Sequence, residues 1–594
     1  MLRAVTLVIG AALLASVVPS ARADLPIHCL NNQVAGSWVF EMSADTYDKS
    51  ESCGYHAPDV NALHFTKKPM KFAVARKMEF TLVQPNQVHD ATGKVIGHWT
   101  MVYDEGFEVV VDGITFFAFN KYVPKKHTSL NSEEVGDYVS ICDKTMVGWF
   151  HNRDRTRFGC YKGYQTAKLR FRQTAAAAED TETEDDRVEE SESTTAAAAA
   201  PAIAFNPNHV VSPFAFEADS KDVHPVGTSA VAVAEDSDEE DASEDLAFYE
   251  LEQMTSANRH DSRRNVVRRS PVRGDDEVFA PDMSFVEAHN SNSQSTWRAG
   301  VHSEFLGKRM AAMDQLLSRR RFVKVHANAA GSDSGDVGPG VPRGPLNKKS
   351  RKYLSELSKM PKEFSWIKYD SPVRNQGECG ACYSLAAMTV YEVRLRIKSQ
   401  MKDKTIMSGQ DVLSCSRTNQ GCEGGYPFLV GKHATEYGLV PEACVPYKAS
   451  DIDCDSVRFT SSSCANRRYY AKNYRYVGGY YGSCNELLMM KEIMRNGPVI
   501  VAFQAPSSLF YYTGGIFTGP PPKREGATEH GVRYWEQTNH AVVAMGWGEE
   551  NGHKYWIIKN TWGPKWGEKG YFRIQRGTDE CGVESMATTF DVVL

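Results

Sequence analysis

After its N-terminal segment, the sequence lacks any apolar run that approaches the roughly 20 residues needed to span a bilayer. It also lacks a broad basic region, because its formal net charge is -6 and its basic residues form only short clusters. Phosphate backbones and anionic lipid surfaces attract such basic regions. We therefore expect that the mature chain binds neither nucleic acid nor a membrane.

The N-terminal segment has the pattern of a secretory signal peptide. An apolar run at residues 4–19 is followed by Ala21-Arg22-Ala23, the small-x-small motif at which such peptides are cleaved. A membrane anchor is the alternative, but the run is too short to span a bilayer. We predict that residues 1–23 are removed and that Asp24 begins the mature chain.

Residues 161–378 contain no cysteine, although the chain has 13. Because the secretory pathway is oxidising, we expect disulfides, and an odd count leaves at least one thiol. The four cysteines before the gap can pair in three ways, and their spacing does not choose among them. The gap divides the chain into three parts.

The first part, residues 24–172, has the alternation of β-strands. Residues 99–111 and 114–122 alternate between apolar and polar side chains and are interrupted at Gly106 and at Asp112-Gly113. Period-two runs that are broken at such turn residues are typical of β-hairpins. This part is predicted to be an all-β unit.

The middle part, residues 173–360, contains alanine runs and acidic runs, the latter at residues 179–186 and 235–245. Such composition buries too little apolar surface to offset the entropy of ordering. The acidic runs are either a solvated, disordered insert, which we favour, or a surface for a cationic partner. Only residues 285–317 have helical apolar spacing, and they could fold against another domain.

The third part, residues 361–594, is long enough for one enzyme domain. Its segment Cys379-Gly380-Ala381-Cys382-Tyr383 matches the Cys-Gly-[Ser/Ala]-Cys-[Trp/Tyr] signature around a nucleophilic cysteine. Cys382 opens a predicted helix over residues 383–399. The free N–H groups and the dipole at a helix start favour a thiolate, which is the attacking species.

Other residues complete a catalytic set around Cys382. His540 can hold the thiolate as an ion pair. Asn560 can orient the imidazole through its side-chain carbonyl, and Trp562 can shield the pair from water. Gln376, six residues before the nucleophile, can donate its amide hydrogens to the oxyanion of the tetrahedral intermediate.

Each of these residues also has a structural explanation: an inert cysteine, a structural histidine, or a turn at residues 560–563. Their combination favours catalysis. A zinc site is the alternative use of Cys and His, but no Cys-x-x-Cys pair is matched by a second one, so we expect no metal. The interval from Cys382 to His540 exceeds the usual 130 to 150 residues or so. We attribute the excess to an exposed loop around residues 519–526, which could be cleaved.

On these motifs, the third part resembles the papain family of cysteine proteases, and the whole chain resembles the dipeptidyl-peptidase I (cathepsin C) family within it. The likeness extends to segments of the first part that resemble that family's β-barrel exclusion domain, at residues 36–40, 98–111, 116–119 and 145–149. The stretch around Trp297 resembles its propeptide. The resemblance implies an α+β fold, in which an all-β exclusion-domain barrel precedes a papain-like, two-lobed peptidase domain.

The resemblance also implies a function and a set of disulfides. The chain would be a cysteine exopeptidase that releases dipeptides from free N-termini of peptides and proteins, made as a secreted zymogen. The implied disulfides are Cys29 with Cys142, Cys53 with Cys160, Cys379 with Cys422, Cys415 with Cys454, and Cys444 with Cys464. Cys382, Cys484 and Cys581 remain as thiols, and the last two are expected to be buried and structural.

Substrate-binding residues follow from the same resemblance. The Asp24 carboxylate would receive the ammonium of the substrate, so that two residues fit between it and Cys382; otherwise Asp24 is merely an exposed polar residue. Gly424 and Gly425 would let a substrate strand lie against bare backbone, and a simple turn is the alternative.

The family binds chloride through a backbone N–H that matches Tyr426 and through hydroxyls that match Phe428 and Tyr476. Phe428 has no hydroxyl, so one anion ligand is missing and we expect weaker chloride dependence. No other cofactor is expected.

The sequence has no Asn-x-Ser/Thr site for N-glycans, which removes glycan-directed sorting. We expect a lysosome-like, vacuolar or secretory-organelle lumen, or secretion, and the resemblance implies a homotetramer. Two alternative functions remain: a papain-like endopeptidase with an accessory β-domain, and a non-catalytic scaffold. A dipeptide reporter with a free amine and its N-acetylated twin would separate the three.

Overall fold

The computed structural model describes residues 27–47, 53, 72–125, 138–168, 277–317, 348–457, 464, 467–519 and 538–594. Asp24, the signal peptide, the acidic runs and all but the first residue of the predicted loop at residues 519–526 lie outside the described residues. Within the described ranges, no helix combines the length and the apolar character that a membrane crossing requires.

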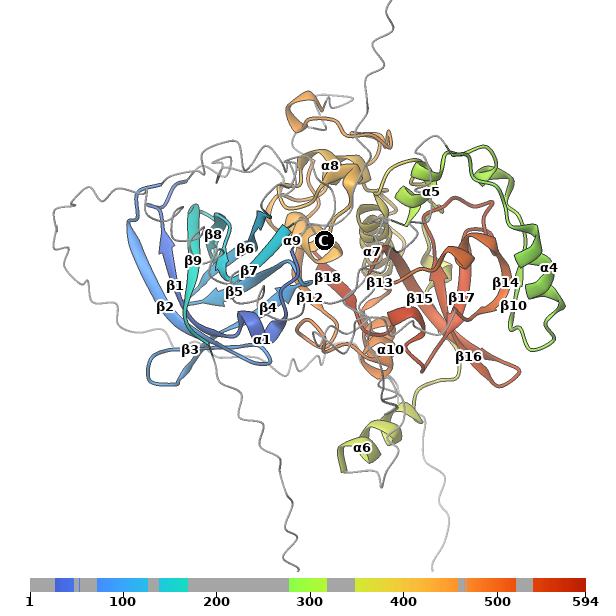
Figure 1. Ribbon diagram of the computed structural model, residues 1–594, viewed down its shortest axis with the longest axis horizontal. Helices are drawn as coiled ribbons and strands as arrows, with labels where there is room; N and C mark the ends of the chain where they lie inside the picture. Colours follow the sequence, from blue (N-terminus) through green and yellow to red (C-terminus); the bar gives the residue numbers. More distant parts are fainter. Residues whose placement is uncertain are drawn as a thin grey trace, which may run out of the picture. The chain divides into compact units, whose positions relative to one another are not determined.

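The described N-terminal part forms a nine-stranded antiparallel sheet that closes on itself, because the first strand pairs with both the second and the ninth (blue to teal in Figure 1). This confirms the predicted all-β unit. The strands are β1 (Gly36–Met42), β2 (Arg76–Val83), β3 (Gln87–His89), β4 (Val95–Val102), β5 (Gly106–Val111), β6 (Ile114–Pro124), β7 (Tyr138–Thr145), β8 (Gly148–Asn152) and β9 (Phe158–Lys168), and the short helix α1 (Asn31–Val34) precedes them.

Aromatic side chains fill the barrel. The ring centroid of Phe40 lies 4.7 Å from those of Phe80 and Tyr161 and 5.1 Å from that of Phe116. These side chains come from four different strands and point inward, as the period-two alternation predicts. The aromatic contacts therefore hold opposite walls of the barrel together.

The peptidase part is built on a second nine-stranded sheet with the strand order β10-β14-β17-β16-β15-β13-β18-β12, and β11 also pairs with β15. Its strands are β10 (Trp297–Ala299), β11 (Phe364–Ser365), β12 (Ala471–Tyr476), β13 (Val499–Phe503), β14 (Tyr512–Phe517), β15 (His540–Glu550), β16 (His553–Lys559), β17 (Tyr571–Gln575) and β18 (Ala587–Val592). Its helices are α4 (Met283–Ser291), α5 (Met310–Leu316), α6 (Lys348–Leu357), α7 (Cys382–Lys398), α8 (Gly409–Cys415), α9 (Pro427–Glu436) and α10 (Glu486–Asn496).

Helix α7 is the central helix of this part, and its bounds agree with the predicted helix to within one residue. Every side chain from Cys382 to Arg396 is buried. The helix packs against β15, β18 and α9, so that apolar side chains of α7 and of the sheet share one core. This burial fixes the start of α7 relative to the start of β15.

The prediction of a helical stretch over residues 285–317 is partly wrong. The structure has α4 and α5 at its two ends, but Trp297 lies in the edge strand β10, where it pairs with Gly515 of β14. The apolar spacing identified the buried side chains correctly. Their backbone conformation is set by pairing with a strand more than 200 residues away, a tertiary interaction that overrides local pattern.

All five disulfides implied by the resemblance are present: Cys29–Cys142, Cys53–Cys160, Cys379–Cys422, Cys415–Cys454 and Cys444–Cys464. Cys382, Cys484 and Cys581 are in no disulfide. Cys484 and Cys581 are half-buried, not fully buried as expected. Burial nevertheless raises the pKa of the Cys581 thiol to about 12, so it is a poor nucleophile.

Candidate active site

The nucleophile candidate Cys382 is the first residue of α7, and its side chain is 4% exposed. The chain before it is tied down by the Cys379–Cys422 disulfide and by a 2.8 Å hydrogen bond from the Gly380 N–H to the Cys422 carbonyl. A Cβ at Gly380 would lie 2.5 Å from that carbonyl oxygen, so only glycine fits. These constraints place the sulfur at the start of the helix, where backbone N–H groups favour a thiolate.

His540 and Asn560 form the pair that the sequence predicts. His540 begins β15, which packs against α7, and its neighbour Ala541 shares an apolar cluster with Cys382. The His540 Nε2 lies 2.8 Å from the Asn560 Oδ1. The Nδ1 atom has no hydrogen-bond partner among the described residues. It is therefore the ring nitrogen that remains for proton exchange with the thiol.

Burial is the main influence on this imidazole, which is 2% exposed. It lowers the pKa of His540 from its ordinary value of 6.5 to about 4, and the hydrogen bond with Asn560 opposes that shift. When residues 277–317 are packed on the peptidase, the imidazole of His540 is therefore neutral at neutral pH.

Trp562 lies on the imidazole as predicted. The two rings are stacked with their centroids 5.0 Å apart and an interplanar angle of 27°. The indole is itself covered, because its Nε1 donates to the Leu316 carbonyl at 3.3 Å and Phe305 contacts its face edge-on. Residues 277–317 therefore pack directly over the tryptophan that shields His540.

Gln376 is fully buried and rigidly held. Its Oε1 accepts a 2.6 Å hydrogen bond from the Thr561 hydroxyl, and its Nε2 donates to the Cys379 carbonyl at 3.0 Å. A carboxamide carries two amide hydrogens, so one of them remains for an oxyanion. Thr561 was not singled out in the sequence, although it lies between Asn560 and Trp562.

The two glycines at the predicted substrate edge are required by their surroundings. Gly424 has φ 122°, a conformation that favours glycine. A Cβ at Gly425 would lie 2.5 Å from the Asn419 Oδ1 and 2.7 Å from the ring of Tyr383. Both positions therefore require glycine, which agrees with a simple turn and with an edge against which a substrate strand can lie.

The three residues matched to the chloride ligands, Tyr426, Phe428 and Tyr476, lie in one apolar cluster. The rings of Phe428 and Tyr476 are stacked at 4.9 Å, and the Tyr426 N–H donates to Asn419 at 2.7 Å. As for metals, no group of three or more His, Cys, Asp or Glu side chains within the described ranges could hold an ion.

The barrel contributes a residue that sequence reasoning missed. Tyr103, in the turn between β4 and β5, is buried with its ring centroid 5.1 Å from that of Tyr426. Its N–H donates to the Tyr476 hydroxyl at 3.3 Å, and its own hydroxyl has no hydrogen-bond partner in the described part of the chain. Burial raises the pKa of Tyr103, and the charge of Cys382 adds to that effect. Nothing in the local sequence predicts that contact.

A buried charge network joins the barrel to α9. The Lys432 ammonium lies 3.0 Å from a Glu108 oxygen and 2.8 Å from a Glu436 oxygen, and all three side chains are nearly inaccessible. The Tyr474 hydroxyl donates to Glu108 at 2.8 Å, and His151 lies 2.8 Å from Glu436. Burial raises the pKa of Glu436, but Lys432 and His151 outweigh it and lower that pKa to about 2. Glu436 therefore stays ionised at neutral pH, and through Lys432 the network joins α9 to Glu108 of the barrel.

Comparison with known proteins identifies both parts. Residues 360–590 match the family described as papain family cysteine protease, and residues 24–165 match the cathepsin C exclusion domain. Cathepsin C of Schistosoma mansoni is 37% identical over 323 residues, which are 52% of this chain and 66% of that protein. Dipeptidyl aminopeptidase 1 of Plasmodium falciparum (isolate 3D7) is 23% identical over an alignment of 691 residues that covers 95% of this chain and 93% of that protein. Cathepsin B-like cysteine proteinase 5 of Caenorhabditis elegans is 33% identical over 246 residues, which are 36% of this chain and 68% of that protein.

The lowered pKa of His540 predicts that the free energy of unfolding depends on pH. Between about pH 6.5 and pH 4 the imidazole binds a proton in the unfolded chain but not in the folded one, so the free energy of unfolding falls as the pH falls through this window. We expect His540→Gln to reduce this pH-dependent decrease in the free energy of unfolding by about 3 kcal/mol. The substitution is made on a Cys382→Ala background, which prevents self-digestion, and urea unfolding at a series of pH values measures the free energy. The matched control is His553→Gln, whose side chain is solvent-exposed. Equal slopes in both variants would contradict the assignment.

Proposed function

Because the chain belongs to the papain family of cysteine proteases and carries a cathepsin C exclusion domain, we propose that it removes dipeptides from the free N-termini of peptides and proteins. The observation that carries this proposal is the position of Tyr103. This residue of the barrel is buried among the tyrosines of the peptidase, and its ring centroid lies 5.1 Å from that of Tyr426, which directly follows the predicted substrate edge. A barrel in that place blocks the cleft on the side where a longer N-terminal extension of the substrate would lie.

The proposed chemistry uses only side chains of this chain. The Cys382 thiolate attacks the carbonyl carbon of the second substrate residue, and the oxyanion accepts hydrogen bonds from Gln376 Nε2 and the Cys382 N–H. Protonated His540 then gives its proton to the leaving amine, which departs and leaves an acyl-enzyme. Neutral His540 next takes a proton from water, whose oxygen attacks the thioester, and the dipeptide leaves with restoration of the thiolate and imidazolium. Asn560 keeps the ring oriented through both steps.

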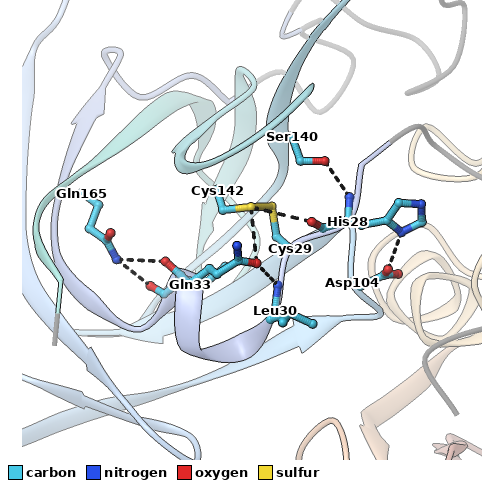
Figure 2. Close-up of a disulfide and its surroundings, with 9 residues drawn as sticks. His28, Cys29, Leu30, Gln33, Asp104, Ser140, Cys142 and Gln165 are labelled. Carbon is cyan, nitrogen blue, oxygen red and sulfur yellow. Dashed lines mark hydrogen bonds and ion pairs between the residues drawn. A yellow bond between two sulfur atoms is a disulfide. The ribbon is translucent and has the colours of Figure 1, made fainter. Parts of the chain in front are cut away.

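The start of the described chain supports an N-terminal anchor for the substrate. The His28 ring lies 2.5 Å from the Asp104 carboxylate, and the Cys29 N–H donates to the Asp104 carbonyl at 2.7 Å. Figure 2 shows both His28 and the Cys29–Cys142 disulfide at this point. Asp104 directly follows Tyr103, so the chain start is fixed beside the turn that reaches the active site.

Asp24 lies outside the described residues, three positions before the buried Ile27. Ile27 belongs to the same apolar cluster as Tyr103 and Tyr426, so the described chain start takes part in the contact of the barrel with the peptidase. We propose that the Asp24 carboxylate receives the substrate ammonium, so that two substrate residues fit between it and Cys382.

The decisive experiment compares two reporters that differ only at the amine. Processed protein is incubated with a chromogenic dipeptide amide and with its N-acetylated twin. Cleavage of the free-amine reporter alone supports a dipeptidyl-peptidase. Cleavage of both reporters indicates an endopeptidase with an accessory barrel, and cleavage of neither indicates a scaffold.

We also propose that residues 277–317 keep the enzyme latent. Phe305, Leu316 and Leu317 are buried in the peptidase core around Trp562, so release of the segment would expose the indole and the adjacent imidazole to substrate. Separation of residues 277–317 from the peptidase during activation, followed by mass spectrometry, should coincide with the appearance of activity. Activity of the uncleaved chain equal to that of the processed enzyme would contradict the proposal.

We propose a compartment and an assembly on the basis of the disulfides and of the resemblance to the dipeptidyl-peptidase I family. Five disulfides form in an oxidising compartment, which places the chain in the secretory pathway. Within that pathway we propose a lysosome-like, vacuolar or secretory-organelle lumen, or secretion, and a homotetramer as the assembly. Immunolocalisation and light scattering of the processed enzyme test the two points, and a monomer would contradict the second.

The charge network at α9 predicts which substitution would weaken the contact of the barrel with the peptidase and so admit N-blocked substrates. Lys432→Met leaves Glu108 and Glu436 buried without their cation, and the loss of one partner of a buried pair costs about 3–5 kcal/mol. We expect the barrel to undock and the activity on the N-acetylated reporter to rise relative to that on the free-amine reporter. Glu550→Gln, which breaks the exposed pair with Arg573, is the matched control and should leave the ratio unchanged. A constant ratio in Lys432→Met would show that the network does not hold the barrel.

A further inference from the structure

The backbone N–H of Tyr426, which corresponds to an anion ligand in related enzymes, already has an acceptor within this chain. It donates to the Oδ1 atom of Asn419 at 2.7 Å. Asn419 is 1% exposed, and its amide nitrogen donates to the Ser416 hydroxyl at 2.7 Å. Both ends of the carboxamide are thus engaged, and its oxygen is fixed toward Tyr426.

The two other groups of the expected anion site offer only one donor. Phe428 has no hydroxyl, and its ring lies face to face with that of Tyr476 at an interplanar angle of 16°. The Tyr476 hydroxyl oxygen accepts the N–H of Tyr103 at 3.3 Å, a bond that does not use the O–H hydrogen. Of the three expected donors, the Tyr426 N–H is taken by Asn419 and the hydroxyl at position 428 is absent, so only the Tyr476 O–H remains. A single donor does not fit a buried chloride ion.

The apolar surroundings also disfavour an anion. Tyr426, Phe428 and Tyr476 are buried in one apolar cluster. A halide would add a negative charge to this apolar interior, where an unpaired charge is costly. A neutral carboxamide oxygen accepts the same hydrogen bond without that cost.

We propose that Asn419 replaces the halide: its side-chain oxygen holds the Tyr426 N–H and makes the enzyme independent of chloride. The segment it holds is the proposed substrate edge, since Tyr426 directly follows Gly424 and Gly425. A second bond, from the Gln420 N–H to the Gly424 carbonyl at 3.0 Å, closes the same loop. Asn419 is thus a positioning residue, and its effect on catalysis, but not on halide binding, rests on the proposed function.

The experiment creates a halide requirement by removing the built-in acceptor. Asn419→Ala leaves the Tyr426 N–H buried without a partner, and a halide can then enter the space of the deleted carboxamide. In chloride-free gluconate buffer, kcat/KM on the free-amine reporter should fall about five- to 150-fold and should recover when chloride replaces gluconate at equal ionic strength. Wild-type kcat/KM should be the same in both salts.

Matched variants separate this role from general destabilisation. Ser416→Ala removes the partner of the Asn419 nitrogen but keeps the oxygen, so this variant should remain independent of chloride. The double variant Asn419→Ala/Phe428→Tyr, which regains a hydroxyl, should respond to lower chloride concentrations than Asn419→Ala alone. A merely structural role for Asn419 would lower activity equally in both salts.

A second readout does not depend on catalysis. On a Cys382→Ala background, chloride and bromide should raise the Tm of the Asn419→Ala and double variants and leave that of the parent unchanged, relative to gluconate. A halide-dependent Tm in the parent, or folded Asn419→Ala and double variants that show no halide effect in either assay, would overturn the proposal. If the reporter assay fails for every variant but the Tm shifts appear, the halide inference stands and the proposed function is at fault.

Discussion

Replacement of Cys382 by alanine is expected to lower turnover of the free-amine reporter by at least about 10⁴-fold, because the substitution removes the only atom that can form the acyl-enzyme. Cys382 closes no disulfide, and alanine is well tolerated at the start of α7. The protein should therefore fold as before. Reporter hydrolysis by the processed variant measures the loss, and its circular dichroism spectrum and Tm measure the fold.

The other two thiols provide the matched controls. Cys484→Ala and Cys581→Ala also remove half-buried thiols outside the disulfides, but burial raises the pKa of both, so neither supplies a thiolate near neutral pH. Both variants should keep most of the wild-type activity and its labelling by a thiol-directed inactivator. If Cys382→Ala stays active or is still labelled, the nucleophile has been assigned to the wrong residue.

The positions of the candidate catalytic residues could be predicted from the sequence, because each of them lies in a short segment whose local conformation follows from its own residues. Cys382 begins a helix that the apolar pattern predicts. His540 begins β15 and Asn560 directly follows β16, and antiparallel pairing of these consecutive strands brings the two side chains within hydrogen-bond distance. The alternation of residues 99–122 similarly fixed the hairpins of the barrel, with the first turn at residues 103–105, just before the predicted break.

The contacts between parts could not be predicted, because they depend on surfaces that meet only after each part has folded. Neither the insertion of Tyr103 among the peptidase tyrosines nor the pairing of Lys432 with Glu108 leaves a local signal. The strand at Trp297 could not be predicted for the same reason, since pairing with β14 determines its conformation. Asn419 is a subtler case: a buried asparagine in a loop is recognised as the partner of Tyr426 only when the N–H that it binds can be seen.

The same distinction bears on the substrate anchor, which is a contact between the chain start and the cleft. Asp24→Ala is expected to lower kcat/KM on free-amine dipeptide reporters by about ten- to 150-fold, because a charge-assisted hydrogen bond of the substrate ammonium contributes about 1.5–3 kcal/mol. The loss should appear in KM and kcat together if the anchor also aligns the scissile carbonyl with Cys382. Steady-state kinetics on the processed variant provides the measurement, with N-terminal sequencing to establish that residue 24 begins the chain.

Two controls make the anchor assignment specific. Asp154→Ala makes the same change at an exposed position of the barrel and should leave the kinetics unchanged, since Asp154 is remote in sequence from the chain start. The N-acetylated reporter has no ammonium, so Asp24 should give it no advantage in the wild type. Deletion of residues 24–172 should go further than Asp24→Ala and open the cleft to internal bonds of longer peptides. Two outcomes would contradict the anchor: full activity of Asp24→Ala on the free-amine reporter, or a deletion variant that is active but does not cleave internal bonds. In either case an N-terminal carboxylate does not set the length of the released peptide, and the contact of the barrel through Tyr103 must serve the peptidase in another way.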